Sequence, residues 1–411
     1  MSTPKYKIKD LEAVLQVDGE LKNVRVTRLS PPGENYLSVV LGIEADVDKD
    51  GRVVKKNAVA KCIPPGERKF VHFHEHSMKN EIRWYTDIVP LFREFAREHG
   101  LSGDLFPAYW GSRIGEGPTP DPDCVLLLEN LKPEGYDNDD RYVGCDLVTS
   151  KAVLKTLALF HAIPLGLKYR SPARFKVFRD YIDNCKFPDM DPPPEHHLED
   201  GEDAYATPEK AFVEAVNNIL ECRPYLDKLI PYVSQPIGPP DCNTIGDEPW
   251  STVSHNDVWV NNIMIKRRND GEEPLIKLVD FQMCGYKSFA LDVVFFLLTS
   301  VINDVLRESF DDLIRHYYEE LTKNLATFKV DLDLTYDKYL EELEQAARSS
   351  EIAHSLVFSN IVFGEKGTGV DIAVEEFNPM VHMTKMIQNM GENQREKIVL
   401  IASECAKRNW L

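Results

Sequence analysis

Several features that mark other classes of protein are missing from this sequence. Its eight cysteines form no C-x-x-C pair, so neither a zinc site nor a disulfide framework is indicated. The longest apolar run, near residues 293–298, is much shorter than the roughly 20 residues that cross a bilayer. The first ten residues are polar and charged, and they lack the apolar stretch of a secretory signal peptide. We therefore expect a cytoplasmic protein in a reducing compartment.

Positive charge is also scarce. The chain has 48 basic and 67 acidic residues among 411, a net charge of -19. Such a field repels nucleic acid and anionic membrane surfaces, so we expect neither as a partner. A nucleotide can still bind where a local lysine and Mg²⁺ outweigh the distant charge. With 43% hydrophobic and 28% charged residues, the composition is that of an ordinary soluble globular protein, which we expect to be a monomer.

What the sequence does contain is a run from His255 to Asn262 that spaces His, Asp and Asn as H-x-D-x-x-x-x-N. A further aspartate, Asp280, follows an apolar segment. Phosphoryl transfer from ATP needs one carboxylate beside the acceptor hydroxyl and oxygen ligands for Mg²⁺. Asp257 suits the first task, and Asn262 and Asp280 suit the second. Each motif alone is common by chance, but the joint pattern predicts a phosphotransfer site.

The segment between these motifs explains how they can meet. Residues 263–266 and 275–279 read as two strands joined by an Asn-Asp-Gly turn signal. A hairpin of this length reverses the direction of the chain, so its two ends lie close together. Asp280 is therefore expected beside Asn262 at the open end of the hairpin. Asn261 is the ambiguous neighbour, and we assign the metal to Asn262 because it completes the spacing.

The rest of the chain divides into a strand-rich and a helix-rich part. Short apolar segments with turn signals come first, and Pro90 and Gly100 then interrupt and end a helical stretch. Between Lys186 and Ala206 an acidic, proline-rich segment reads as a surface loop. We expect strands at residues 24–29, 37–45, 53–54, 58–63, 108–113 and 124–128, and helices at residues 73–100, 151–161, 207–230, 292–305, 310–325, 336–349 and 379–390.

This order predicts an α+β, bilobal, protein-kinase-like fold. Residues 1–130 would form an N-terminal nucleotide-binding lobe, a small antiparallel sheet with one main helix. Residues 131–411 would form a larger, mostly helical C-terminal lobe that holds the catalytic loop, the metal site and the acceptor site.

The sequence resembles the ecdysteroid kinase-like family of small-molecule kinases, whose fold is that of aminoglycoside phosphotransferases and choline kinases. The resemblance covers nearly the whole chain. It rests on the two catalytic segments and on the segments Gly33–Ser38, Asn80–Tyr85, Leu127–Leu131 and Phe160–Ala162.

The resemblance assigns further roles in nucleotide binding. Lys61 is similar to the lysine that contacts the α and β phosphates of ATP, and Glu81 to the helix glutamate that pairs with it. Without the resemblance, both would read as ordinary surface charges. Gly33, Asn35 and Ser38 would belong to the loop that covers the phosphates.

Two parts of the nucleotide site stay open. The phosphate loop holds a single glycine and two prolines, and Glu34 replaces the aspartate usual in the family, so its contacts are not fixed. Residues Glu129 to Leu131 are implied to be the hinge whose backbone binds adenine, and an ordinary strand end is the alternative.

Other polar residues near the motifs have plainer interpretations. We expect His161 to be a hydrogen-bonded core histidine and His255 to orient the catalytic loop. Asp292 opens an expected helix, so it either caps that helix or supports the loop. Trp259 is expected to pack.

Together these observations predict an ATP- and Mg²⁺-dependent kinase that phosphorylates a hydroxyl of a small apolar alcohol. By resemblance, ecdysteroids are the leading acceptors, and Tyr286 and Phe289 could line an apolar site. Two alternatives remain: a choline- or aminoglycoside-type kinase with a cationic acceptor, and a non-catalytic binding protein on a kinase scaffold.

Overall fold

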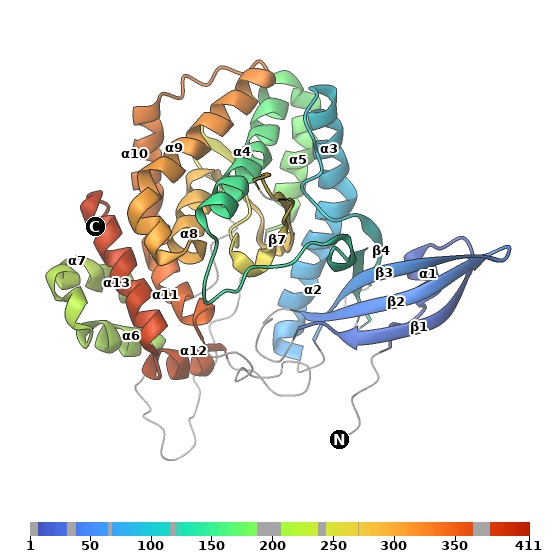
Figure 1. Ribbon diagram of the computed structural model, residues 1–411, viewed down its shortest axis with the longest axis horizontal. Helices are drawn as coiled ribbons and strands as arrows, with labels where there is room; N and C mark the ends of the chain where they lie inside the picture. Colours follow the sequence, from blue (N-terminus) through green and yellow to red (C-terminus); the bar gives the residue numbers. More distant parts are fainter. Residues whose placement is uncertain are drawn as a thin grey trace, which may run out of the picture.

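The computed structural model describes residues 7–30, 38–64, 68–115, 121, 123–186, 207–236, 244–269, 271–364 and 379–411. A small β-sheet lies to one side of a larger mass of helices (Figure 1). The α+β class and the kinase-like arrangement of a sheet followed by helices are therefore confirmed. The boundary near residue 130 stays a prediction, although it falls directly after the last strand of the sheet.

The N-terminal sheet has five antiparallel strands in the order β1-β2-β3-β5-β4. The expected turn at the end of the β2 strand is present, with Lys49 paired to Arg52 across the two residues Asp50 and Gly51. Both turn residues have positive φ, 51° and 79°, which the right-handed twist of a hairpin requires and an Asp-Gly pair tolerates. The strands are β1 (Glu20–Arg28), β2 (Val39–Lys49), β3 (Arg52–Cys62), β4 (Tyr109–Arg113) and β5 (Val125–Glu129), and the short helix α1 (Leu11–Leu15) contacts β4.

The helical stretch of this part of the chain is divided by a π-turn. Helix α2 (Arg68–Arg83) runs into the π-turn Trp84–Ile88, and α3 (Val89–Glu98) follows. Pro90 lies in the first turn of α3, and it has no N–H to donate to the π-turn before it. Gly100 ends the stretch with φ 73°. The interruption predicted at Pro90 is thus real, but it takes the form of a wider turn just before the proline.

The C-terminal part is built around α4, which packs along α9 and is buried over most of its length. A second π-turn, Ala347–Glu351, joins α10 to α11. The helices are α4 (Leu147–Arg170), α5 (Pro172–Asn184), α6 (Pro208–Asn217), α7 (Leu226–Val233), α8 (Ala290–Ser300), α9 (Asn303–Thr327), α10 (Tyr336–Ala346), α11 (Ile352–Val362), α12 (Pro379–Gln388) and α13 (Glu392–Lys407).

Two of the expected helices end well before the predicted residue. Thr207 caps α6 as predicted, but that helix ends at Asn217, and a 3₁₀ segment with Pro224 separates it from α7. A proline removes a backbone donor and disfavours the helical conformation of the residue before it. The prediction of one continuous helix to residue 230 was therefore wrong. The helix expected over residues 292–305 ends at Ser300, because Val301 is extended and bridges to Cys145. Helices α1, α5, α11 and α13 were not predicted, and most of the proline-rich segment lies outside the described residues.

Two small hairpin-like ladders carry the catalytic segments. Strands β7 (Ile263–Lys266) and β8 (Leu275–Leu278) pair antiparallel as predicted, and β6 (Ser251–Ser254) pairs with β9 (Gly285–Ser288). These ladders place the chain before Asp257 and after Asp280 side by side. No helix in the described part of the chain is long and apolar enough to span a membrane.

Candidate active site

The hairpin brings the two predicted metal ligands to the same place. At its open end the Val279 N–H donates to the Asn262 carbonyl at 3.1 Å, so Asp280 directly follows a residue bonded to Asn262. The Asn262 amide Nδ2 donates to both the carbonyl and the carboxylate Oδ2 of Asp257, at 2.8 Å each. This orientation leaves the Asn262 Oδ1 without a hydrogen-bond partner among the described residues.

Asp280 has an unusual backbone that aims its carboxylate. Its φ of 70° and ψ of 64° lie in the left-handed region, which is uncommon for residues other than glycine. The neighbours hold this conformation. The Phe281 N–H donates to Glu81 Oε1 at 3.3 Å, and the Phe281 ring stacks on Trp84 with centroids 4.7 Å apart. On the other side, His255 Nε2 donates to the Val279 carbonyl at 3.0 Å.

Lys61 joins the sheet and the catalytic hairpin. Its Nζ lies 2.5 Å from Glu81 Oε2 and 2.7 Å from Asp280 Oδ1. Both Lys61 and Glu81 are almost fully buried. Burial alone would lower the pKa of Lys61, but the carboxylates of Asp280 and Glu81 outweigh it and raise that pKa. The lysine is therefore charged and bridges β3, α2 and the turn after β8.

Asp257 has the electrostatic setting of a proton acceptor. Desolvation raises its pKa well above the usual range, and the negative charge of Asp280 adds to that rise. The hydrogen bond from Asn262 and the charge of Lys61 oppose it. Asp257 nevertheless keeps part of its surface exposed, so a hydroxyl group can reach it.

A buried chain of hydrogen bonds supports the loop before Asp257. Asp292 Oδ2 accepts from the backbone N–H of His255 at 2.7 Å, and Oδ1 accepts from that of Asn256 at 2.9 Å. His161 Nε2 donates to Asp292 Oδ2 at 3.0 Å, and His161 Nδ1 lies 2.7 Å from the Tyr317 hydroxyl. The expectations for His161 and His255 are confirmed.

Asp292 supports the catalytic loop and does not cap a helix. Helix α8 begins at Ala290, two residues earlier, so the capping interpretation was wrong. Burial would raise the pKa of Asp292, but the hydrogen bond and charge of His161 lower it below its usual value. The carboxylate thus stays ionised and holds both loop N–H groups. Tyr317 had no signal in the sequence, because it lies 156 positions from the histidine it contacts.

Asn138 is a second residue that the sequence did not reveal. Its Nδ2 donates to the carbonyls of Asn261 at 2.9 Å and Ile263 at 3.0 Å. It therefore fixes the backbone on both sides of Asn262. Asn261 contributes its backbone carbonyl to this contact, and the assignment of the metal to Asn262 stays a prediction.

The expected hinge keeps two backbone groups available. The N–H groups of Glu129 and Asn130 donate to Ala108 and Asn57 carbonyls at 2.8 and 2.9 Å, as at an ordinary strand end. The Ala108 N–H donates to the carboxylate of Glu129 at 3.1 Å instead of to its carbonyl. The Leu131 N–H has no hydrogen-bond partner within the described ranges. One acceptor and one donor therefore remain for a ligand.

The other expected site residues divide into three groups. Gly33 and Asn35 lie outside the described residues, whereas Ser38 is described and buried just before β2. Tyr286 and Phe289 do not line a site, because protein atoms cover them almost completely: their exposed fractions are 1% and 0%. Trp259 packs as expected, edge-on against Phe358 on α11 with ring centroids 5.0 Å apart.

The oxygen donors beside Asp257 fit magnesium. No group of three or more His, Cys, Asp or Glu side chains is arranged to hold a metal ion in the part of the chain that the structure describes. Mg²⁺ is commonly held by one or two carboxylates together with water and substrate phosphates. One carboxylate, Asp280, and the unpartnered amide oxygen of Asn262 fit that requirement.

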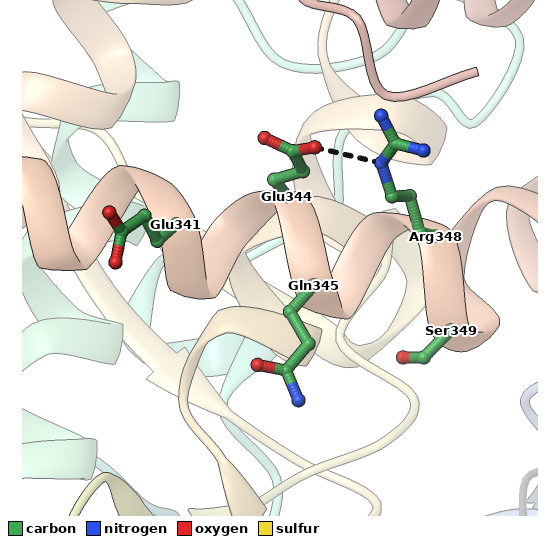
Figure 2. A pocket seen from close by; sticks show the side chains of 5 residues that line it. All are labelled: Glu341, Glu344, Gln345, Arg348 and Ser349. Atoms are coloured by element: carbon green, nitrogen blue, oxygen red, sulfur yellow. Dashed lines mark ion pairs between the residues drawn. The ribbon is translucent and has the colours of Figure 1, made fainter.

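A hollow elsewhere on the surface belongs to a different part of the molecule. It lies along α10 and the following π-turn and is lined by Glu341, Glu344, Gln345, Arg348 and Ser349. Figure 2 shows these side chains on one stretch of helix, with Glu344 paired to Arg348 at 2.9 Å. None of the catalytic residues described above contributes to it.

These features together define a phosphotransferase of the protein-kinase-like class. They are the five-stranded sheet, the buried lysine and glutamate, the H-x-D-x-x-x-x-N loop and the aspartate that follows the hairpin. The chain belongs to the ecdysteroid kinase-like family, whose sequence profile matches residues 32–330. Membership of this family supports a small-molecule kinase.

Solved structures with weak overall likeness were also found. One is an ethanolamine kinase from Plasmodium vivax, with 10% identity, a TM-score of 0.39, and coverage of 89% of this chain and 81% of that chain. Another is a microcompartment-associated aminopropanol kinase, with 12% identity, a TM-score of 0.42, and coverage of 98% of this chain and 99% of that chain. A third is a choline/ethanolamine kinase family protein from Mesorhizobium loti, with 10% identity, a TM-score of 0.30, and coverage of 92% of each chain. With TM-scores of at most 0.42, they say nothing about what this chain phosphorylates. No curated protein matches the sequence.

Proposed function

We propose that this protein is an ATP- and Mg²⁺-dependent kinase that phosphorylates a hydroxyl group of a small apolar alcohol, with ecdysteroids as the leading acceptors. The single observation that carries the proposal is the convergence of Lys61, Asp257, Asn262 and Asp280 from three separate segments. These groups supply the positive charge, the metal ligands and the carboxylate that phosphoryl transfer requires.

Each group has a distinct task in this proposal. The Lys61 ammonium, oriented by Glu81, binds phosphate oxygens of the nucleotide. Asn262 Oδ1 and the Asp280 carboxylate hold Mg²⁺, which, when bound, neutralises phosphate charge and orients the transferred group. Asp257 accepts a hydrogen bond from the acceptor hydroxyl and takes its proton as the phosphoryl group leaves ATP. Burial and the charge of Asp280 raise the pKa of Asp257, which makes its carboxylate a stronger base than that of an exposed aspartate.

The adenine would bind at the end of β5. The Glu129 carbonyl can accept from the adenine amino group, and the Leu131 N–H can donate to a ring nitrogen. Their availability, described above, supports this assignment. Gly33, Asn35 and Ser38 would contact the phosphates.

A non-catalytic role fits the site less well. A scaffold that only binds has no use for a carboxylate such as Asp257, whose pKa is raised by desolvation. Retention of that residue together with Lys61, Asn262 and Asp280 favours catalysis. We propose a protein that acts in the cytoplasm as a monomer, on a small molecule and not on nucleic acid or membrane.

The acceptor class can be tested by turnover. ATP consumption is measured with hydroxylated steroids, choline and aminoglycosides at rising salt concentration. We expect turnover of the neutral steroid, with a KM that changes little with salt because no ion pair is screened. Strong preference for a cationic alcohol, with a KM that rises with ionic strength, would overturn the steroid assignment but leave the kinase standing. No turnover with any acceptor would contradict the proposal as a whole.

A further inference from the structure

The 3₁₀ turn Phe281–Met283, directly after the hairpin aspartate, is held by contacts to α2. The Phe281 N–H donates to Glu81 Oε1 at 3.3 Å, and the Ser77 hydroxyl donates to Gln282 Oε1 at 3.3 Å. Helix α2 carries both the glutamate and the serine, and it lies between the sheet and the larger helical part (Figure 1). The first two residues of the turn are therefore tied to α2.

The third residue of the turn is tied to the catalytic loop, through Asn256. The Asn256 Nδ2 donates to the Met283 carbonyl at 2.8 Å, across 27 positions of the sequence. The Asn256 backbone N–H donates to Asp292 Oδ1, as described above. Asn256 directly precedes Asp257, and Met283 follows Asp280 by three residues. One side-chain amide thus links the two segments that carry the catalytic carboxylates.

Asn256 combines this hydrogen bond with a backbone conformation that few residues adopt. Its φ of 61° lies in the left-handed region, where glycine, asparagine and aspartate are the commonest residues. Glycine has no side chain and an ionised aspartate has no donor, so of the three only asparagine can also donate to the Met283 carbonyl. Asn256 is buried, with an exposed fraction of 9%, so losing the bond would leave buried polar groups unpaired.

The two carboxylates need such a link because they repel each other. The negative charge of Asp280 contributes to the raised pKa of Asp257, so the two groups are near enough to interact. The bond from the Val279 N–H to the Asn262 carbonyl joins their segments just before Asp280 in the chain. The Asn256 amide joins them just after it. The segment of Asp280 is therefore bonded to the catalytic loop on both sides of that residue.

We propose that Asn256 is a positioning residue that sets the Asp280 carboxylate against Asp257, and so couples the metal ligand to the proton acceptor. This inference rests on the proposed kinase function. Without the Asn256 amide, the turn Phe281–Met283 keeps its bonds to α2 but loses this bond to the catalytic loop. The Asp280 carboxylate can then shift relative to Asp257, and the transferred phosphoryl group loses its alignment with the acceptor hydroxyl.

The test removes the amide and keeps the backbone conformation. Asn256→Gly tolerates positive φ but has no donor. Asn23→Gly is the matched control: Asn23 also has a positive φ, 53°, and its Nδ2 donates at 2.8 Å to Asp46 Oδ2, but it lies exposed on the edge strand β1. ATP affinity is measured by calorimetric titration with and without Mg²⁺, and turnover is measured by ADP release.

Asn256→Gly should bind ATP without Mg²⁺ as the wild type does. The gain in ATP affinity that Mg²⁺ provides should fall severalfold, and kcat should fall about tenfold or more, the equivalent of one buried hydrogen bond. Asn23→Gly should match the wild type in all three quantities. A merely structural role for Asn256 would lower the melting temperature and leave the gain from Mg²⁺ unchanged. That result would overturn the proposal, whatever the kcat.

A second variant tests the donor itself. Asn256→Asp keeps the side-chain shape and tolerates positive φ, but its carboxylate would face the Met283 carbonyl oxygen and add negative charge beside Asp257. It should lower the gain from Mg²⁺ and kcat at least as much as Asn256→Gly. Wild-type values in Asn256→Asp would overturn the proposal. Failure of the kinase proposal looks different: the wild type itself would gain no ATP affinity from Mg²⁺ and would transfer no phosphate to any alcohol.

Discussion

Lys61 Nζ lies 2.7 Å from Asp280 Oδ1, although 219 positions separate the two residues in the sequence. The contact joins the nucleotide-side sheet to the catalytic hairpin. With Glu81 Oε2 at 2.5 Å on the other side, one ammonium neutralises two carboxylates in a buried place. In the proposed mechanism this arrangement holds the sheet and the catalytic hairpin together on either side of the phosphates.

Replacing Lys61 by Met should lower kcat/KM for ATP by several powers of ten, because the phosphates lose their cation and two buried carboxylates lose their partner. Glu81→Gln should reduce it by less, since the lysine remains. Lys55→Met, on the exposed part of the same strand, is the matched control and should behave as wild type. Steady-state kinetics at varied ATP checks all three. Equal activity in Lys61→Met and Lys55→Met would remove Lys61 from the site.

Replacing Asp257 by Asn should abolish turnover and leave nucleotide affinity nearly intact, because the carboxylate acts on the acceptor and not on ATP. Nucleotide affinity is measured by calorimetric titration and turnover by ADP release. A variant that retains most of the wild-type kcat would exclude Asp257 as the proton acceptor.

The same substitution should stabilise the protein without ligand. The pKa of Asp257 is raised in the folded state, so the folded protein holds this proton more tightly than the unfolded chain does. Wild-type stability therefore falls as pH rises from about 4, the unfolded pKa, through the folded pKa. Asp257→Asn has no carboxyl group to titrate at this position, so its stability does not fall in the same way. The difference between its melting temperature and that of the wild type should therefore grow with pH. An advantage independent of pH would contradict the raised pKa.

Asp280→Asn should weaken Mg²⁺-dependent binding of ATP, because an amide oxygen carries less charge for the metal than a carboxylate. Half-saturation by Mg²⁺, measured from turnover at fixed ATP, should move to a higher concentration. If the metal dependence stays that of the wild type, the assignment of Asp280 as a ligand is wrong.

Asp292→Asn should reduce kcat by about tenfold or more and lower stability by about 1–3 kcal/mol, because an amide has one acceptor oxygen for two backbone N–H groups. Tyr317→Phe removes only the hydroxyl beside His161 and should cost about 1 kcal/mol in unfolding free energy. Denaturant titration and acceptor kinetics separate the two effects. A full kcat in Asp292→Asn would show that the loop keeps its shape without this carboxylate.

The sequence predicted those parts of the site that local patterns define. The Asp-Gly turn between β2 and β3 and the hairpin between Asn262 and Asp280 each depend on residues adjacent in the chain. The positions of Asn138 and Tyr317 depend on contacts across 123 and 156 positions, and one asparagine or tyrosine has no local signature. Neither could have been found from spacing alone.

The wrong predictions have a similar cause. Tyr286 and Phe289 are aromatic residues that follow Asp280 closely in the sequence, which suggested an apolar site. In the structure, aromatic side chains from distant helices contact them: Phe175 and Phe178 contact Tyr286, and Tyr339 contacts Phe289. Asp292 looked like a cap because α8 starts at Ala290, after Phe289, and a phenylalanine has no side-chain acceptor that would mark a helix start. Burial and register are tertiary properties, and they decided each of these cases.

The most direct test of the central claim follows the γ-phosphate of ATP. The enzyme is incubated with γ-³²P-labelled ATP, Mg²⁺ and a hydroxylated steroid, and the products are separated and counted, with Asp257→Asn as the control. The account predicts label on the steroid with the wild type and none with the variant. Label that appears only as free inorganic phosphate, or equal transfer by both proteins, would contradict it.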